Sequence, residues 1–462
     1  MNKFTRLCLA SAMAISMTAS ALAPSIFAQG AVSSYTSGVQ VANLENSDAS
    51  ITLTAYNASD GNQAGTKSDT ITALGSVTYI QVPGVASGFN GSLVVSSSKK
   101  VAAISNIIHP DFSAGAAYVG LSSGSNSVFL PVLMKGNGAF NTWFSVQNAG
   151  TADATVQVNY TDGTNNTATI KPGAAHVFYQ AQENHTLKVF AGTVVNTGAS
   201  PQPLVAAVIE ETPAIMFAYT GFADGTTNPV FPIVNTNNIV NGRRIASGLQ
   251  IQNVGTTATD VTVSYTPAGA PIGAGTACTE KQTIQPSQSN SFALFIFDAT
   301  ATTPTGITSD CNKSAKFVGS AKVTINSANQ KLVGVGNQLT AGLNGEAYGS
   351  FDANVATNKV VMPLIMDRNS GYFTGFSVQN VGTVATTVSC TFKPASSYAP
   401  SKLLQPGEAM FDIENGLIAD KYVGSGTCAS TDAAAKLVGV VSELSLTRPG
   451  AQLLVYEAVN SQ

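Results

Sequence analysis

Short segments in which hydrophobic and polar residues alternate recur along most of the chain, and four of them end in the same phrase. An alternation with a period of two is typical of β-strands that bury one face. The phrase reads TSGVQVAN, NTWFSVQN, ASGLQIQN and TGFSVQN, and it ends at Asn43, Asn148, Asn253 and Asn380. These asparagines lie 105, 105 and 127 residues apart, which indicates one folding unit used four times.

Each copy of the unit contains further strand candidates in a common order. Three copies open with an apolar segment that contains proline: VFLPVLM (128–134), VFPIV (230–234) and VVMPLIM (360–366). Because proline cannot complete a ladder of hydrogen bonds, each of these segments is predicted to be an edge strand. With six or seven strands per unit of ~100 residues, the pattern predicts an all-β fold of four tandem immunoglobulin-like β-sandwiches.

The linkers between these units contain few residues, so the four sandwiches are expected to form an elongated, semi-rigid rod. The third unit is longer than the others, and its extra segments carry two cysteines. The predicted domains are a signal peptide at 1–28 and β-sandwich repeats at 29–127, 128–228, 229–359 and 360–462.

The N-terminus has the layout of a cleaved secretory signal peptide. Lys3 and Arg6 precede an apolar run from Leu7, and cleavage is predicted after Ala28. A chain cut there lacks the proline-containing strand in its first repeat, and the uncovered edge could pair with a strand of another chain. The alternatives are that the first repeat closes without this strand, or that cleavage occurs earlier. No later stretch has the ~20 apolar residues of a transmembrane helix. The protein is therefore expected to be secreted, either extracellular or at the cell surface.

Four cysteines follow the predicted signal peptide, in two pairs that each lie within one repeat. Cys278 and Cys311 are 33 residues apart, and Cys390 and Cys428 are 38 residues apart. In an exported protein this arrangement predicts two disulfides. A metal site is the weaker interpretation, because there is no CxxC motif and no histidine nearby.

Composition narrows the range of partners. Only 10% of the residues are charged, compared with roughly 25% in average soluble proteins, and the net charge is −3. The absence of a basic cluster argues against nucleic acid or an anionic membrane as a partner. Few charges remain to keep sheet edges apart, so lateral association is expected. Other copies of the chain, cell-surface proteins or glycans are the expected partners, and no cofactor is expected.

Few residues suggest catalysis. Ser122 lies in GLSSG, which matches the pattern of a nucleophile elbow, but that motif needs a strand–turn–helix context. Ser122 is therefore interpreted as a linker residue. His109, His176 and His185 are dispersed and lack the spacing of metal ligands, so they are interpreted as satisfied or exposed loop residues.

The acidic residues receive similar interpretations. Asp111 and Asp162 lack the further oxygen ligands of a calcium loop. Glu210 and Glu211 are adjacent on a predicted strand and would point to opposite faces, so they are interpreted as turn or surface acids. The chain is accordingly expected not to be an enzyme.

Trp143 is the most suggestive single residue. It occupies a position at which the other repeats carry Gly38, Gly248 and Gly375. Alternation turns it away from the core of its own sandwich, and an exposed indole is typical of a sugar-stacking platform or a protein contact. The alternative is that the ring covers a neighbouring loop or the joint between domains. Tyr372 is a second candidate for stacking.

The signal peptide, the proline-containing opening strands and the FSVQN-type signatures together resemble repetitive, secreted bacterial surface proteins built from immunoglobulin-like modules. The resemblance implies a fold and a compartment, but no catalytic or binding residues. The first hypothesis is a non-enzymatic structural or adhesive surface protein that assembles into a filament or layer through β-edges. The second is a secreted carbohydrate-binding protein that uses Trp143 and Tyr372. The third is a hydrolase with an unrecognised site.

Overall fold

The computed structural model describes residues 5–11, 35–80, 85–86, 88–240, 243–268, 275–327, 330–340, 344–447, 450 and 452–461. They form antiparallel strands and one 3-10 helix, η1 (Gln180–Gln182). Among these residues no helix is long and apolar enough to span a membrane. The chain divides into two compact units, Met1–Ala223 with Arg448–Ala451 and Asp224–Thr447 with Gln452–Gln462.

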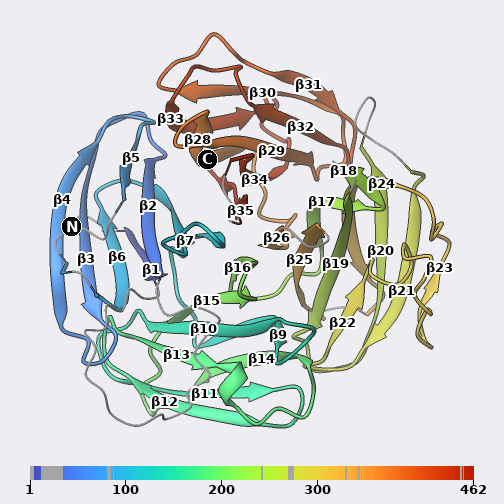
Figure 1. Ribbon diagram of the computed structural model, residues 1–462, viewed down its shortest axis with the longest axis horizontal. Helices are drawn as coiled ribbons and strands as arrows, with labels where there is room; N and C mark the ends of the chain where they lie inside the picture. Colours follow the sequence, from blue (N-terminus) through green and yellow to red (C-terminus); the bar gives the residue numbers. More distant parts are fainter. Residues whose placement is uncertain are drawn as a thin grey trace. The chain divides into compact units, whose positions relative to one another are not determined.

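The first unit contains four sheets, and Figure 1 labels most of their strands. The first two are β1-β6-β3-β4 and β5-β2-β7-β8, and the next two are β12-β11-β14-β9 and β13-β10-β15-β16. The strands are β1 (Thr5–Ser11), β2 (Thr36–Asn43), β3 (Ala49–Asn57), β4 (Gln63–Ile71), β5 (Ser76–Tyr79), β6 (Gly91–Ser97), β7 (Val101–Ile108), β8 (Gly115–Val119), β9 (Ser127–Met134), β10 (Asn141–Asn148), β11 (Ala154–Tyr160), β12 (Asn165–Ile170), β13 (Ala175–Tyr179), β14 (Val189–Asn196), β15 (Leu204–Glu211) and β16 (Met216–Thr220).

The second unit also contains four sheets. They are β23-β21-β20-β24-β17-β27, β18-β19-β25-β26 with β22 beside β19, β31-β30-β33-β28-β36, and β32-β29-β34-β35. The strands are β17 (Pro229–Thr236), β18 (Asn238–Val240), β19 (Arg243–Asn253), β20 (Thr259–Pro267), β21 (Cys278–Ile284), β22 (Ser289–Phe292), β23 (Thr308–Ser309), β24 (Phe317–Ile325), β25 (Leu332–Thr340), β26 (Asn344–Gly349), β27 (Phe351–Asp352), β28 (Lys359–Asp367), β29 (Tyr372–Asn380), β30 (Thr386–Lys393), β31 (Ser401–Leu404), β32 (Ala409–Glu414), β33 (Tyr422–Ala429), β34 (Leu437–Ser445), β35 (Leu453–Glu457) and β36 (Val459–Asn460).

The alternation in the sequence corresponds to burial in the structure. In β30, Val388, Cys390 and Phe392 are buried while the residues between them are exposed. In the first repeat, apolar residues of both sheets meet in one core that includes Val41 of β2 and Leu53 of β3. The all-β prediction is therefore confirmed, and each repeat consists of two sheets.

The signature asparagine is a buried structural residue in all four repeats. In the second repeat, Asn148 Nδ2 donates to Ala152 O at 2.7 Å and to Ile170 O at 2.9 Å, while Gly150 N donates to Asn148 Oδ1 at 2.9 Å. Asn43, Asn253 and Asn380 make equivalent bonds. One side chain thus holds a turn and the end of the next hairpin together, so the fourfold phrase serves the fold.

The proline-containing strands are joined to the closing strands by a tyrosine. Tyr219 OH donates to Val132 O at 2.6 Å, next to Pro131. Tyr456 makes the same bond to Leu364 O, next to Pro363. Tyr348 does so to Ile233 O in the third repeat. Ladder register shifts at each proline. β9 is an edge strand, as predicted. The same prediction is wrong for β17 and β28, because the two-residue strands β27 and β36 pair with their outer sides.

The first repeat fills the same position with a different segment. β1 pairs with β6 from Thr5 opposite Ser97 to Ser11 opposite Gly91. This is the place that β9 takes beside β14 in the second repeat. Most of the predicted signal peptide lies outside the described residues, but the part that is described supplies the edge strand that the first repeat was expected to lack.

A chain that begins at Gln29 is expected to expose the edge of β6, because β1 is then absent. Amide exchange in residues 91–97 should be faster than in the full chain by about tenfold or more, since edge hydrogen bonds open locally. Hydrogen–deuterium exchange read by mass spectrometry measures this, with β14 as the internal control. Equal protection of β6 in both chains would show that another segment pairs there.

Repeats within a unit pack through their sheets. β8 lies against β16 in the first unit, and β26 lies against β35 in the second. In each unit, the second repeat has a sheet face that points away from its own core. This face covers residues of the first repeat of the same unit.

Candidate functional site

Trp143 lies at the joint between the first and second repeats. It is 4% exposed and shares a buried cluster with Ile107, Ala116 and Ile209. Its ring centroid is 5.7 Å from that of Tyr35. Alternation does turn Trp143 out of its own sandwich, but the neighbouring repeat covers that face. The prediction of an exposed stacking platform is therefore wrong, and the ring of Trp143 instead packs in the joint between the two repeats.

The same joint contains a buried hydrogen bond between the repeats. Tyr35 OH donates to Glu211 Oε2 at 2.8 Å. Burial first, and then the charge of Glu211, raise the pKa of Tyr35 well above its usual value. The same two causes raise the pKa of Tyr179 to about 12. Glu210 and Glu211 are 0% and 2% exposed. Their interpretation as surface acids is wrong, because β15 ends inside the packed unit.

Tyr372, the second candidate for stacking, is also covered. It begins β29 and is 6% exposed. Its backbone closes a tight turn with Asn369: Tyr372 N donates to Asn369 O at 2.8 Å, and Asn369 N donates to Tyr372 O at 2.9 Å. Neither predicted aromatic residue therefore offers a free ring face to a sugar.

His185 belongs to a buried network that ties two loops of the second repeat together. His185 Nδ1 lies 3.0 Å from Asp162 Oδ2, which also accepts a bond from Thr186 N at 2.9 Å. Burial raises the pKa of Asp162, but its hydrogen bonds, those from Thr164 above all, outweigh this and lower it to about 2. Thr164 Oγ1 donates to Asp162 Oδ1 at 2.6 Å, so His185 does not activate that hydroxyl. The network is structural.

Of the other sequence candidates for catalysis, His109 and Asp111 lie in one turn, and His176 and Ser122 lie elsewhere in the first unit. His109 Nδ1 lies 2.9 Å from Ser113 Oγ, and Asp111 Oδ1 accepts a bond from Ser113 N at 2.9 Å in the same turn. His176 packs on Phe178 with a centroid distance of 4.7 Å. Burial lowers the pKa of each histidine. Ser122 is exposed between β8 and β9, in a segment that leads into a strand.

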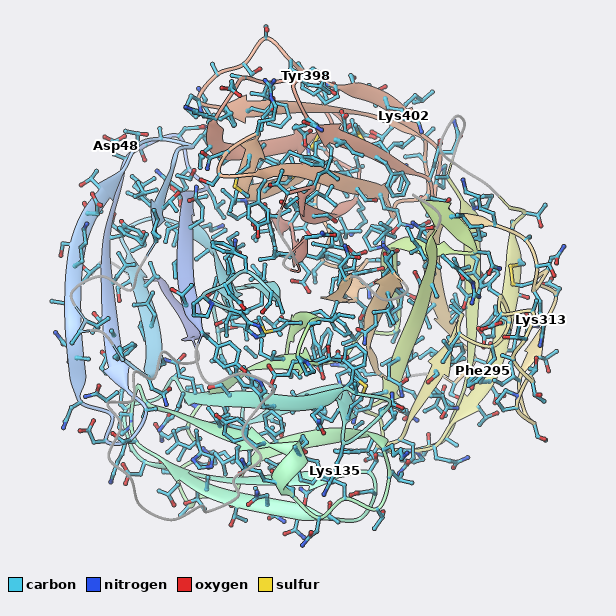
Figure 2. The ribbon with its side chains drawn as sticks, in the orientation of Figure 1. Asp48, Lys135, Phe295, Lys313, Tyr398 and Lys402 are labelled. Atoms are coloured by element: carbon cyan, nitrogen blue, oxygen red, sulfur yellow. A yellow bond between two sulfur atoms is a disulfide. The ribbon has the colours of Figure 1, made fainter. Side chains whose placement is uncertain are left out.

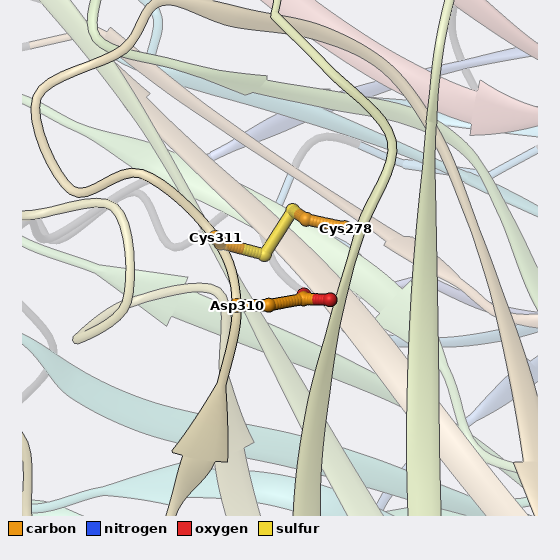
Figure 3. Close-up of side chains that lie close together, drawn as sticks. All are labelled: Cys278, Asp310 and Cys311. Atoms are coloured by element: carbon orange, nitrogen blue, oxygen red, sulfur yellow. A yellow bond between two sulfur atoms is a disulfide. The ribbon is translucent and has the colours of Figure 1, made fainter.

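Both predicted disulfides are present, Cys278–Cys311 and Cys390–Cys428. Figure 3 shows Asp310 beside the first of them, an arrangement with the spacing of a metal site. The two sulfur atoms are bonded to each other, and the Asp310 carboxylate accepts hydrogen bonds from the backbone and hydroxyl of Thr279. No thiolate is available there to bind a metal, so the cluster closes an insertion of the third repeat.

The sheet edges are the remaining candidates for contact with another molecule. β12 ends its sheet, carries no charged residue, and exposes Asn165, Thr167 and Thr169. By comparison, the edge strand β4 carries Lys67 and an aspartate. The edge strand β31 carries Lys402, labelled in Figure 2, which pairs with Glu408 at 3.0 Å. Charged residues protect an edge from pairing with other strands, so β12 is the least protected of these three.

Comparisons with known proteins identify no family for this chain. No family model matches it, and no curated protein matches it. One solved structure, described as a tetra-tandem repeat in the extending region of a large adhesion protein, is 12% identical over 94% of this chain and 97% of that chain. The TM-score is 0.09, so no shared fold is concluded from it.

Proposed function

We propose that this chain is a non-enzymatic, secreted structural or adhesive protein of the cell surface, which associates with other copies of itself through exposed β-edges. The observation that carries the proposal is the uncharged edge strand β12, whose exposed residues are threonine and asparagine. An unpaired edge of this kind is a template for a strand of another molecule.

Two further features support the proposal. The repeated signature residues form hydrogen bonds inside each repeat, as the bonds of Asn148 and Asn380 show. The repetition therefore provides several copies of one structural unit. The two disulfides are typical of proteins in oxidising compartments outside the cytoplasm. The carbohydrate-binding hypothesis has no comparable support, because Trp143 and Tyr372 are buried.

Lysines placed on β12 are expected to weaken self-association of the full chain. In an antiparallel pair of β12 strands, Thr167→Lys and Thr169→Lys would bring like charges close together across the new ladder. The concentration at which the protein assembles should rise by about tenfold or more, measured by sedimentation and by electron microscopy. The matched control carries Thr155→Lys and Asn159→Lys on the inner strand β11, on the same sheet face.

The control variant should assemble like the wild type, because its lysines are one strand away from the edge. A wild-type protein that remains monomeric at every concentration and salt would contradict self-association. If both variants weakened self-association equally, this would contradict association through the edge of β12 and indicate association through the sheet face.

A further inference from the structure

The second unit, which consists of the third and fourth repeats of the chain, contains a cavity of about 610 Å³ between these two repeats. Its wall is mostly apolar and includes Phe376, Phe411, Val440 and Leu453. This volume lies within the range of small-molecule sites, which combine apolar walls with a few placed polar groups. All the lining residues belong to this one unit.

Comparison with the first unit shows why the cavity is there. In the first unit, Trp143 lies opposite Ile209 on the sheet face that covers the joint, and both side chains fill it. In the fourth repeat, the corresponding opposed pair is Gly375 and Ser442, and both line the cavity. Two small residues thus stand where two large ones close the other joint.

The opposite wall differs in polarity as well. In the first repeat, Ile107 lies opposite Ala116 in the joint. In the third repeat, the corresponding pair is Gln338 and Glu346, which also line the cavity. An apolar pair has therefore been replaced by two polar side chains at the place where space has opened.

Glu346 is the most unusual of these residues. It is 2% exposed, and its Oε1 atom has no hydrogen-bond partner in the described protein. Its other oxygen accepts only a long bond from Ser442 Oγ at 3.5 Å. Burial raises its pKa to about 8, and the bond from Ser442 offsets this only partly. A carboxyl group buried without partners is costly for the fold, so its position here calls for an explanation.

Two further polar atoms that line the cavity are hydrogen-bond acceptors, so they favour a ligand that donates hydrogen bonds. Asn235 Oδ1 and Asn344 Oδ1 are buried acceptors without partners in the described protein. Among the described residues that line the cavity, none is a lysine, arginine or histidine, and Asp412 is the second acid. The neighbouring strands β34 and β35 carry two more acids, Glu443 and Glu457. The described lining therefore offers carboxyl groups and amide oxygens to a ligand, and no cationic side chain.

We propose that this cavity binds a hydrophobic organic amine, with the ammonium group donating to Glu346 Oε1 and the apolar body against Phe411, Val440 and Leu453. The acceptor oxygens of Asn235 and Asn344 take the remaining ammonium hydrogens. This site is independent of the self-association proposed above, because its lining residues all belong to the second unit and β12 belongs to the first.

Binding of the cation should release a proton from the protein. At about pH 6.5, below its raised pKa, Glu346 is mostly protonated, and an ammonium beside it favours the ionised form. The carboxyl proton then passes to the buffer while the amine keeps its own. Up to one proton per bound ligand is expected, since Glu346 is the buried acid of the lining.

Isothermal titration calorimetry of the full chain tests the proposal. 2-Phenylethylammonium is the probe, and 2-phenylethanol and 3-phenylpropionate are the neutral and anionic analogues. Titrations at about pH 6.5 in two buffers of different ionisation enthalpy measure the proton release. The amine should bind saturably at one site, about tenfold or more tighter than either analogue, and should release protons.

Glu346→Gln keeps the shape of the side chain and removes the charge, so it should weaken amine binding by about tenfold or more and abolish proton release. Glu443→Gln, on β34 outside the lining, is the matched control and should leave both unchanged. Gly375→Trp should block the cavity as Trp143 fills the first joint. No saturable binding of the amine, equal binding of the alcohol, or unchanged binding by Glu346→Gln would each overturn the proposal.

Discussion

Replacing Trp143 by alanine is expected to lower the free energy of unfolding of the first unit by about 3–5 kcal/mol, the usual cost of truncating a buried tryptophan. The ring is almost fully buried and contacts residues of both repeats, so its loss leaves a cavity that neither repeat can fill alone. Denaturant unfolding of the full chain, followed by circular dichroism, measures the change, because the variant has no tryptophan left as a fluorescent probe.

Ile80→Ala is the control for this prediction. Ile80 is 80% exposed in the same unit, and its truncation should change stability by less than about 0.5 kcal/mol. The wild-type protein offers an independent check, since Trp143 is its only tryptophan. Its emission should be blue-shifted in the native state and move to the red on unfolding. Native emission typical of an indole in water would contradict the buried joint.

Replacing the signature asparagine Asn380 by alanine is expected to destabilise the second unit by roughly 3–5 kcal/mol. Its amide donates to Val384 O at 2.8 Å and to Leu404 O at 3.1 Å, and its oxygen accepts from Gly382 N at 3.0 Å. The variant leaves these three backbone groups without this partner, one in a buried and two in partly buried places, and a buried unpaired group costs about 1–3 kcal/mol. Chemical denaturation with circular dichroism provides the measurement.

Asn380→Asp distinguishes this explanation from a simple loss of volume. The carboxylate keeps the acceptor for Gly382 N but faces the oxygens of Val384 and Leu404 with no donor, so it should destabilise the unit at least as much as alanine does. Asn415, exposed beyond β32, is the control, and Asn415→Ala should have little effect. An aspartate variant as stable as the wild type would show that the two carbonyl bonds contribute little.

The two units show that the joint between two repeats can be filled by side chains or can contain a cavity. The second repeat of each unit presents the same sheet face, and the occupants of two opposed positions decide the result: Trp143 with Ile209, or Gly375 with Ser442. Because side chains in protein interiors pack closely, the small pair leaves a volume that no other residue takes up. Departures from the repeat, more than the repeat itself, therefore distinguish the two units.

Features that depend on local pattern could be predicted from the sequence. Alternation placed the strands, because the side chains of a strand point to its two faces in turn. The equal spacing of Asn43, Asn148 and Asn253 indicated repetition, and the position of the cysteines within single repeats predicted both disulfides. Alternation was also right about the direction of Trp143, which points away from its own core.

Only the tertiary structure showed which neighbouring repeat covers each sheet face that points away from its own core. Trp143 and Glu211 are buried because another repeat covers them, and a pattern within one strand carries no information on that neighbour. The cavity beside Glu346 depends on substitutions in two repeats that are distant in the sequence and meet only after folding. The strands and their repetition were thus determined by the sequence alone, because they follow from local periodicity. The burial, the joints and the cavity were determined by packing between repeats, because burial is a property of pairs of surfaces.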